Sequence, residues 1–164
     1  MSSKPAIAIV ILNWNGKSLL GKFLPSVLKN SDREGVSVYI ADNSSTDGSP
    51  EFLRSSFPGV KLILLDKNYG FSGGYNRALG QVEADYFILL NSDVEVTPGW
   101  IEPCIRCMEE DPLIVAVQPK VMSYLHRDRF EYSGAAGGFI DYLGYPFCRG
   151  RILTVTETDR GQYD

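Results

Sequence analysis

Five short apolar runs constrain the fold of this chain more than any other feature of its sequence. They begin near residues 6, 36, 60, 86 and 113, and they are rich in Ile, Val and Leu. Continuous runs of this length are typical of strands that are buried on both faces of a sheet. A helix-length segment separates each run from the next. This alternation predicts an α/β fold with a mostly parallel, doubly wound sheet and helices on both faces.

The segments between the runs carry signals for helices. Apolar residues recur at spacings of three and four from Leu19 to Leu28, which indicates an amphipathic helix. Pro25 lies inside this helix and predicts either a kink or a late start. Ser49 is expected to be the N-cap of the second helix, and a third helix is expected from Phe71 to Leu79. The Thr97-Pro98 pair predicts the start of a fourth helix, and the last apolar run is expected to form a fifth strand.

Polar residues follow four successive runs at the points where the predicted strands leave the sheet. These clusters are Asn13-Trp14-Asn15, Asp42-Asn43-Ser44, Asp66-Lys67-Asn68 and Asn91-Ser92-Asp93. The carboxyl ends of parallel strands line one edge of an open sheet, where ligands bind. The Asp93 carboxylate and the Asn91 amide would suit a hard cation and a sugar or ribose hydroxyl. Polar turns that bind nothing remain the alternative.

Composition narrows the class of protein. The 164 residues suit about one domain, and the net charge of −4 offers no basic surface for nucleic acid. No apolar stretch is long enough to span a membrane. Three cysteines cannot form a closed set of disulfides, which favours a reducing compartment. We therefore expect a cytoplasmic domain, or one that is peripheral to the inner face of the membrane.

The alternation of strand and helix ends near residue 121. Residues 1–121 are therefore predicted to form one α/β domain, and residues 122–164 the start of a second subdomain that stops short. Within the latter, the glycine-rich stretch 133–138 is expected to be a flexible or closely packed loop, and Tyr142–Pro146 a turn. On this pattern we expect the chain to be truncated at its C-terminus.

Four stretches, in this order, resemble the nucleotide-binding half of a family 2 glycosyltransferase with the GT-A fold, of the rhamnosyltransferase-like branch. They read VILNWNG from Val10, ADNSSTDGS from Ala41, NYGFSGGYNRAL from Asn68 and LLNSD from Leu89. The resemblance covers roughly residues 6 to 121. It implies that residues 1–121 form the nucleotide-sugar-binding domain and that residues 122–164 begin the acceptor-side subdomain. No dinucleotide-binding or P-loop glycine motif competes with it.

The resemblance implies a role for each matching position. The turn at Asn13, Trp14 and Asn15 would pack against the nucleobase. Asp42 matches the aspartate that hydrogen-bonds the base of a uridine or thymidine diphosphate sugar. Together these four residues are predicted to recognise the nucleoside.

Further along the chain, Gly74 and Asn76 match the segment that approaches the ribose and diphosphate. Asp93 matches the last acid of the D-x-D motif, which holds the Mg²⁺ or Mn²⁺ that bridges the two phosphates. Asn91 replaces the first acid of that motif, so one carboxylate is missing, although the amide can bond a ribose hydroxyl. Tyr75 stands where many members have an arginine that faces the nucleotide.

The implied reaction moves a sugar from the nucleotide-diphospho-sugar to a saccharide or lipid-linked acceptor, with inversion. A cation held by Asp93 would stabilise the charge that grows on the leaving diphosphate. An inverting enzyme also needs a carboxylate base, and no stretch of 122–164 matches the family's acidic motif. Asp141, Glu157 and Asp159 are expected to be solvated loop acids. The catalytic base is therefore unassigned, and the chain alone is expected to bind the donor with little or no turnover.

Two other functions are alternatives to glycosyl transfer. A sugar-1-phosphate nucleotidyltransferase would need a glycine-rich loop with Arg and Lys directly after the first strand, whereas Asn13-Trp14-Asn15-Gly16 stands there. A non-catalytic α/β binding module would bind no nucleoside diphosphate, and its polar strand ends would be incidental.

Four residues suggest sites that we do not favour. Cys104 and Cys107 have zinc spacing, but they lie inside a predicted helix, where packing is the better explanation. His126 is the only histidine and is expected to be exposed. Asp47 is expected to be a helix-start or turn residue rather than a ligand.

Overall fold

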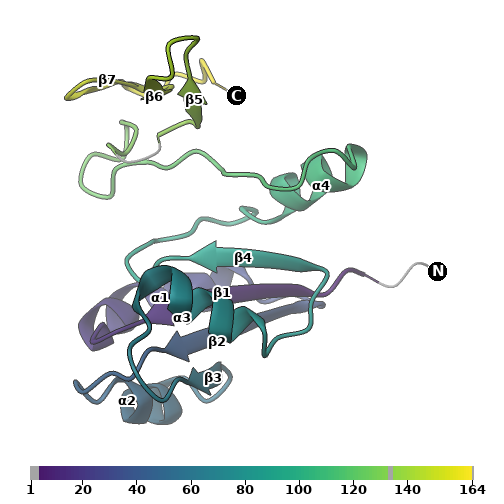
Figure 1. The fold of residues 1–164 in the computed structure, drawn as a ribbon, viewed down its shortest axis with the longest axis vertical. Helices are drawn as coiled ribbons and strands as arrows, with labels where there is room; N and C mark the ends of the chain where they lie inside the picture. The colour runs from purple at the N-terminus through teal and green to yellow at the C-terminus, as the bar shows by residue number, and fades with distance from the viewer. Residues whose placement is uncertain (1–3, 133–134, 164) are drawn as a thin grey trace. The chain divides into compact units, whose positions relative to one another are not determined.

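The computed structural model describes residues 4–132 and 135–163. The chain divides into two compact units, Met1–Gly99 and Trp100–Asp164. Each unit has its own sheet (Figure 1). This division precedes the predicted boundary at residue 121, and the assignment of 1–121 and 122–164 to separate functions stays a prediction.

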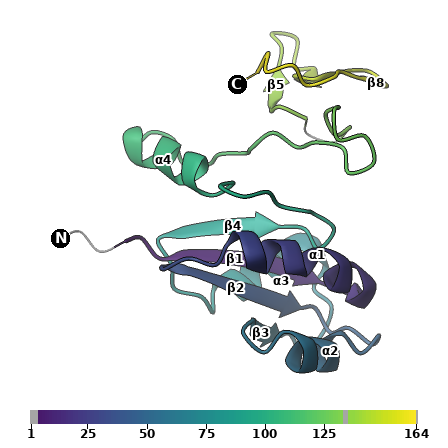
Figure 2. The ribbon, with the colours of Figure 1, turned by 180° about the vertical axis from the view of Figure 1, so that it is seen from behind.

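The first unit is a parallel α/β structure, as the alternation of runs predicts. Its elements, in chain order, are β1 (Ile7–Asn13), α1 (Lys17–Asn30), β2 (Val36–Asp42), α2 (Ser49–Ser56), β3 (Lys61–Leu64), α3 (Gly70–Leu79) and β4 (Tyr86–Leu90). The four strands lie in the order β3-β2-β1-β4, and every neighbouring pair is parallel. Helices α1 and α3 cover opposite faces of this sheet (Figures 1 and 2).

Strand β1 is the centre of the first unit, with β2 on one side and β4 on the other. Residues Ile7–Ile11 are all buried, because both faces of this strand are covered. The register pairs Asn13 with Asp42 at the carboxyl ends of β1 and β2. An apolar strand that ends in Asn therefore delivers a polar side chain to the rim of the sheet.

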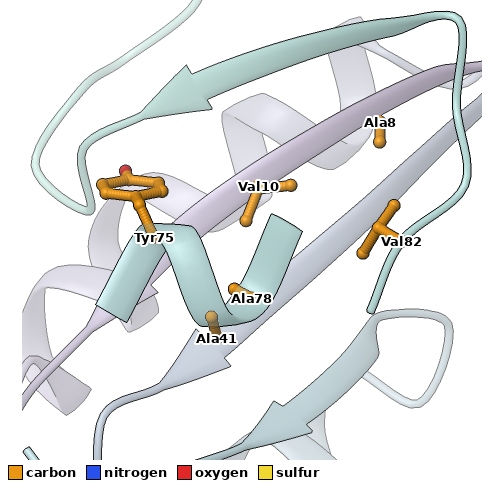
Figure 3. Packing of buried hydrophobic residues seen from close by; sticks show 6 residues of the cluster. All are labelled: Ala8, Val10, Ala41, Tyr75, Ala78 and Val82. Carbon is orange, nitrogen blue, oxygen red and sulfur yellow. The ribbon is translucent and has the colours of Figure 1, made fainter. Parts of the chain in front are cut away.

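Helix α3 packs closely on β1 and β2. The buried cluster between them consists of Ala8, Val10, Ala41, Tyr75, Ala78 and Val82 (Figure 3). Three alanines in this set allow the helix to approach the strands. At Gly74 an added Cβ would lie 2.8 Å from Leu12 Cδ1, so a larger residue here would require the Leu12 side chain to shift.

Helix α1 differs from the expectation at Pro25. The helix begins at Lys17 and continues through Pro25 to Asn30, so a late start is wrong. Pro25 is exposed, and water can bond the carbonyl that the missing N–H leaves free.

Two helix starts also differ from the sequence signals. Ser49 is the first residue of α2 rather than its N-cap; Gly48 takes that place, with φ 77°. Helix α4 (Glu102–Glu110) begins four residues after Pro98. Gly99, with φ 73°, has a left-handed backbone conformation that cannot be part of the helix. Its end before Asp111 agrees with the prediction.

The predicted fifth strand, Leu113–Val117, is wrong. The segment is not a strand, and Leu113 and Val115 are 86% and 87% exposed. Its β-branched composition gives it strand propensity, but a strand also needs a partner for its backbone groups.

The second unit contains α4 and a small antiparallel sheet. The strands are β5 (Gly138–Ile140), β6 (Pro146–Cys148), β7 (Arg151–Ile152) and β8 (Val155–Thr156), in sequence order within the sheet. Phe130 is buried beside Gly150, where an added Cβ would lie 2.6 Å from the ring. The turn predicted near Tyr142 joins β5 to β6, whereas these short strands were not predicted. Ser133 and Gly134, in the predicted loop, lie outside the described residues.

Among the described residues, no helix is long and apolar enough to cross a membrane.

Candidate functional site

The carboxyl ends of β1 and β2 are joined by a buried pair, Asn13 and Asp42. They are 0% and 2% exposed, respectively. The Asn13 side-chain amide donates to Asp42 Oδ2 at 2.8 Å, and Asp42 Oδ1 accepts from the Ser45 backbone N–H at 2.8 Å. Asn13 Oδ1 in turn accepts from the Gly16 N–H at 3.1 Å. These bonds fix the carboxylate, yet each of its oxygens can accept a further hydrogen bond.

The loops that follow β1 and β2 are held to each other through Asn15. Its backbone N–H donates to Ser45 Oγ at 2.8 Å, and its side-chain oxygen accepts from the Thr46 N–H at 2.7 Å. Asn15 has φ 53°, a left-handed conformation that Asn tolerates better than most residues. The neighbouring Trp14 is 59% exposed. The loop contacts therefore hold Trp14 at the surface, directly after the buried Asn13.

Asp47 joins the first turns of two helices. One carboxylate oxygen accepts from the Lys17 N–H at the start of α1 at 2.9 Å, and the other accepts from the N–H and hydroxyl of Ser49 at the start of α2. Burial acts to raise the pKa of Asp47, but the hydrogen bonds from Ser49 and Lys17 outweigh it and lower that pKa. The predicted helix-start role is confirmed.

Asn43, which was named from the sequence in a strand-end cluster without being given a role, links several elements at the rim. It is 2% exposed, and its side-chain amide donates to Asn68 Oδ1 and to the Gly70 carbonyl, both at 3.0 Å. Its side-chain oxygen accepts from the Tyr69 N–H at 2.9 Å. Asn43 thus ties the loop before α3 to the end of β2. A signal was present in its position directly after Asp42, within the second motif.

Helix α3 places its three candidate residues in different surroundings. Gly74 is buried against Leu12, and Asn76 is exposed. Tyr75 is buried, and its hydroxyl donates to the Leu90 carbonyl at 3.0 Å, so its side chain does not face the solvent at the rim. Burial raises the pKa of Tyr75.

The residues after β4 complete the rim. Asn91 and Asp93 are exposed, and Ser92 between them is half-buried. A Cβ built at Gly16 would lie 3.7 Å from Ser92 Oγ, which places this segment beside the turn after β1. The structure therefore gathers the ends of all four parallel strands, and the predicted site residues, in one region of the first unit.

The donor atoms at this rim suit a divalent cation that arrives with a ligand. Among the described residues, no group of three His, Cys, Asp or Glu side chains could hold a metal ion. Asp93 offers one exposed carboxylate. Mg²⁺ is commonly held by one or two carboxylates together with substrate phosphates, and the donor set fits that arrangement.

The two cysteines with zinc spacing lie on α4, and both are half-buried. Burial, with a smaller effect of Cys107, raises the pKa of the Cys104 thiol, which disfavours the thiolate that zinc binds. His126 is exposed, as predicted.

Comparison with known proteins decides the family. The model of the family described as Glycosyl transferase family 2 matches residues 8–156. The chain belongs to this family. It is 29% identical over 126 residues to N-acetylglucosaminyl-diphospho-decaprenol L-rhamnosyltransferase from Mycobacterium tuberculosis, covering 70% of this chain and 41% of that protein. It is 30% identical over 162 residues to Succinoglycan biosynthesis protein ExoO from Rhizobium meliloti, covering 96% and 46%. The chain thus spans less than half the length of these relatives.

Solved structures agree on the fold. A mannosyltransferase from Pyrobaculum calidifontis, in complex with GDP-Man and Mn²⁺, has a TM-score of 0.57 at 19% identity, over 74% of this chain and 35% of that one. S. aureus TarS in complex with UDP-GlcNAc has a TM-score of 0.57 at 18% identity, over 71% and 38%. At this identity the likeness shows the GT-A fold alone. The predicted family and fold class are confirmed, while the roles of the individual site residues stay predictions.

Proposed function

We propose that this glycosyltransferase family 2 chain binds a nucleotide-diphospho-sugar, of the UDP or dTDP class, at the rim of its parallel sheet. The observation that carries the proposal is the buried Asn13–Asp42 pair, with the exposed Trp14 beside it. The donor sugar would pass, with inversion, to a saccharide or lipid-linked acceptor of polysaccharide biosynthesis. The family match gives no support to the nucleotidyltransferase alternative.

Recognition of the base falls to Asp42 and Trp14. The Asp42 carboxylate can accept the ring N–H of uracil or thymine in addition to its two present hydrogen bonds. Trp14 offers an exposed indole on which the base can stack. Asn13 orients Asp42, and Asn15 holds the loop that presents Trp14. Preorganised groups of this kind lower the entropic cost of binding.

The ribose and diphosphate would lie between α3 and the end of β4. Asn76 and Asn91 are exposed amides that can bond hydroxyl or phosphate oxygens. Gly74 lets α3 pack against Leu12, at the end of the rim where the helix would approach the diphosphate. Asp93 would hold Mg²⁺ or Mn²⁺ together with the phosphates, and the ion would neutralise charge on the departing diphosphate. The Mn²⁺ named for the mannosyltransferase complex supports the use of a divalent ion.

Among the described residues, the acids in the predicted acceptor-side segment do not supply a catalytic base. The acids expected to be loop residues have local partners: Asp141 accepts from the N–H groups of Leu143 and Tyr145, and Asp159 pairs with Lys120 at 2.9 Å. The hydrogen bond from Lys120 lowers the pKa of Asp159, which makes it a poorer base. We assign no catalytic base. A lipid-linked acceptor is suggested by the decaprenol named for the mycobacterial relative, and it would place the protein in the cytoplasm, at the inner face of the membrane.

Calorimetric titration tests the proposal. We expect UDP or dTDP to bind more tightly than GDP, and Mn²⁺ to strengthen that binding. Asp93→Ala should remove most of the metal enhancement, a loss of at least about tenfold. Asp66→Ala is the matched control, because Asp66 is also an exposed acid at the end of a parallel strand. Equal metal enhancement in the Asp93→Ala variant and in the unaltered chain would contradict the role of Asp93.

A further inference from the structure

Tyr75 connects helix α3 to the end of strand β4. Its ring is 4% exposed and packs among small side chains of the buried cluster. Its hydroxyl donates to the Leu90 carbonyl at 3.0 Å. Figure 3 shows this hydroxyl pointing toward the carboxyl end of β4, away from Val82 at the far end of the cluster.

The carbonyl that accepts the Tyr75 hydrogen bond lies at the end of strand β4. Leu90 is the last residue of β4, and Asn91, Ser92 and Asp93 follow it directly. Strand β4 lies at an edge of the parallel sheet and pairs with β1 alone among the described strands, up to the Ile11–Leu90 pair. Beyond that pair the ladder gives the backbone no support, so the Tyr75 hydroxyl provides an anchor from the helix side.

Packing alone does not explain a tyrosine here. Phenylalanine would fill the same volume and would avoid the burial of a hydroxyl, which is favourable only when the group is hydrogen-bonded. The Tyr75 hydroxyl donates to the residue before the exposed Asn91–Asp93 segment, and a backbone hydrogen bond from Leu12 near the end of β1 also reaches it. The hydroxyl thus links the end of β1 to the end of β4, the strand end that carries the candidate metal-binding carboxylate.

We propose that Tyr75 is a positioning residue for Asp93. Its hydroxyl holds the last carbonyl of β4, and this fixes the direction in which the Asn91–Asp93 segment leaves the sheet. Tyr75 itself touches neither nucleotide nor metal. The inference rests on the proposed function, since it gives the Asp93 carboxylate its task, but the geometry of the segment can be measured without any ligand.

The test compares Tyr75→Phe with Val82→Ala. Both variants change a residue of the same buried cluster, but only the first removes the bond to Leu90. Amide hydrogen exchange is measured in the ligand-free chain, as the ratio of the rate for Asn91–Val94 to the rate for the β1 amides. This ratio should be about threefold to tenfold higher in Tyr75→Phe than in the unaltered chain. Val82→Ala should leave that ratio unchanged. Equal ratios in Tyr75→Phe and the unaltered chain would overturn the proposal.

A second measurement reads the effect on the site. Titration with UDP or dTDP should show that Tyr75→Phe loses about threefold to tenfold of the Mn²⁺ enhancement, while metal-free nucleotide affinity stays the same. A uniform loss of affinity with and without Mn²⁺ would mean a structural role only and would overturn the proposal. If the unaltered chain binds neither nucleotide, the proposed function fails, and the exchange ratio still decides whether Tyr75 holds the segment.

Discussion

The two units of this chain differ in how they use apolar side chains. Among the described residues, all but three of the buried hydrophobic side chains lie in the first unit; Ile101, Phe130 and Ala135 are the exceptions. The second unit instead leaves large side chains such as Tyr142, at 94% exposure, in contact with solvent. The first unit therefore has a core that explains its stability, whereas the second has local hairpins around one buried ring.

The same contrast holds for the polar residues. In the first unit, buried Asn and Asp side chains link the ends of neighbouring strands, as Asn13, Asp42 and Asn43 do. In the second unit, the Asp141 side chain accepts from two N–H groups of its own turn, and the partly exposed Lys120–Asp159 pair joins distant segments. Side chains that connect separate elements can shape a binding site, so the candidate site and the core belong to the same unit.

The largest effect is expected from a core truncation in the first unit, compared with truncation of an exposed leucine in the second. Ile9→Ala, at the centre of β1, should lower the free energy of unfolding by about 2–5 kcal/mol, because it leaves a cavity in a fully buried position. Leu153→Ala, at a position 85% exposed in the second unit, should change it by less than about 0.5 kcal/mol. Urea denaturation measures both. Similar losses for the two variants would break the contrast between the units.

A smaller effect is expected from Asn43→Asp. The introduced carboxylate would face two acceptors, Asn68 Oδ1 and the Gly70 carbonyl, and should cost about 1–3 kcal/mol of stability at pH 7. Burial and these acceptors would raise the folded-state pKa of the introduced group above its unfolded value of about 3.9. The folded state then binds more protons, so the deficit should shrink as pH falls toward 4.

Denaturation of Asn43→Asp and the unaltered chain across this pH range checks the prediction. A deficit that does not depend on pH would mean that the Asn43 amide is not needed as a donor.

The smallest effect is expected from Asp47→Asn. The pKa of Asp47 is lowered in the folded chain, so its stabilising contribution is present above the unfolded pKa and is lost as pH falls through the folded pKa. Because Asp47 is exposed, the loss should be under about 1 kcal/mol at pH 7. The variant and the unaltered chain should converge in stability below about pH 4. Thermal denaturation at several pH values measures this, and a constant difference would contradict the capping role.

The sequence predicted those parts of the fold that depend on the composition of a single segment. The four parallel strands were predicted because their apolar runs are continuous and bounded by polar residues. Leu113–Val117 has the same composition but forms no strand, since composition reports propensity and not the presence of a partner. The start of α4 was placed at Pro98 because Gly99 was not recognised as an interruption.

The candidate site was predicted in its location more than in its internal contacts. Residues such as Trp14 and Asp93 were named because polar strand ends share one rim. No role was given to Asn43, and Tyr75 was not expected to be buried, because the direction of a side chain depends on which helix packs over which strand. A linear motif does not contain that information.

The most direct test of the account is a hydrogen-exchange footprint of the whole chain with UDP or dTDP and Mn²⁺. We predict protection in the four segments that form the rim: residues 13–17, 42–47, 68–76 and 91–94. The sheet of the second unit, residues 138–156, should exchange at the same rate with and without nucleotide. Protection confined to the second unit, or shared equally by both units, would contradict the claim that the first unit carries the donor site.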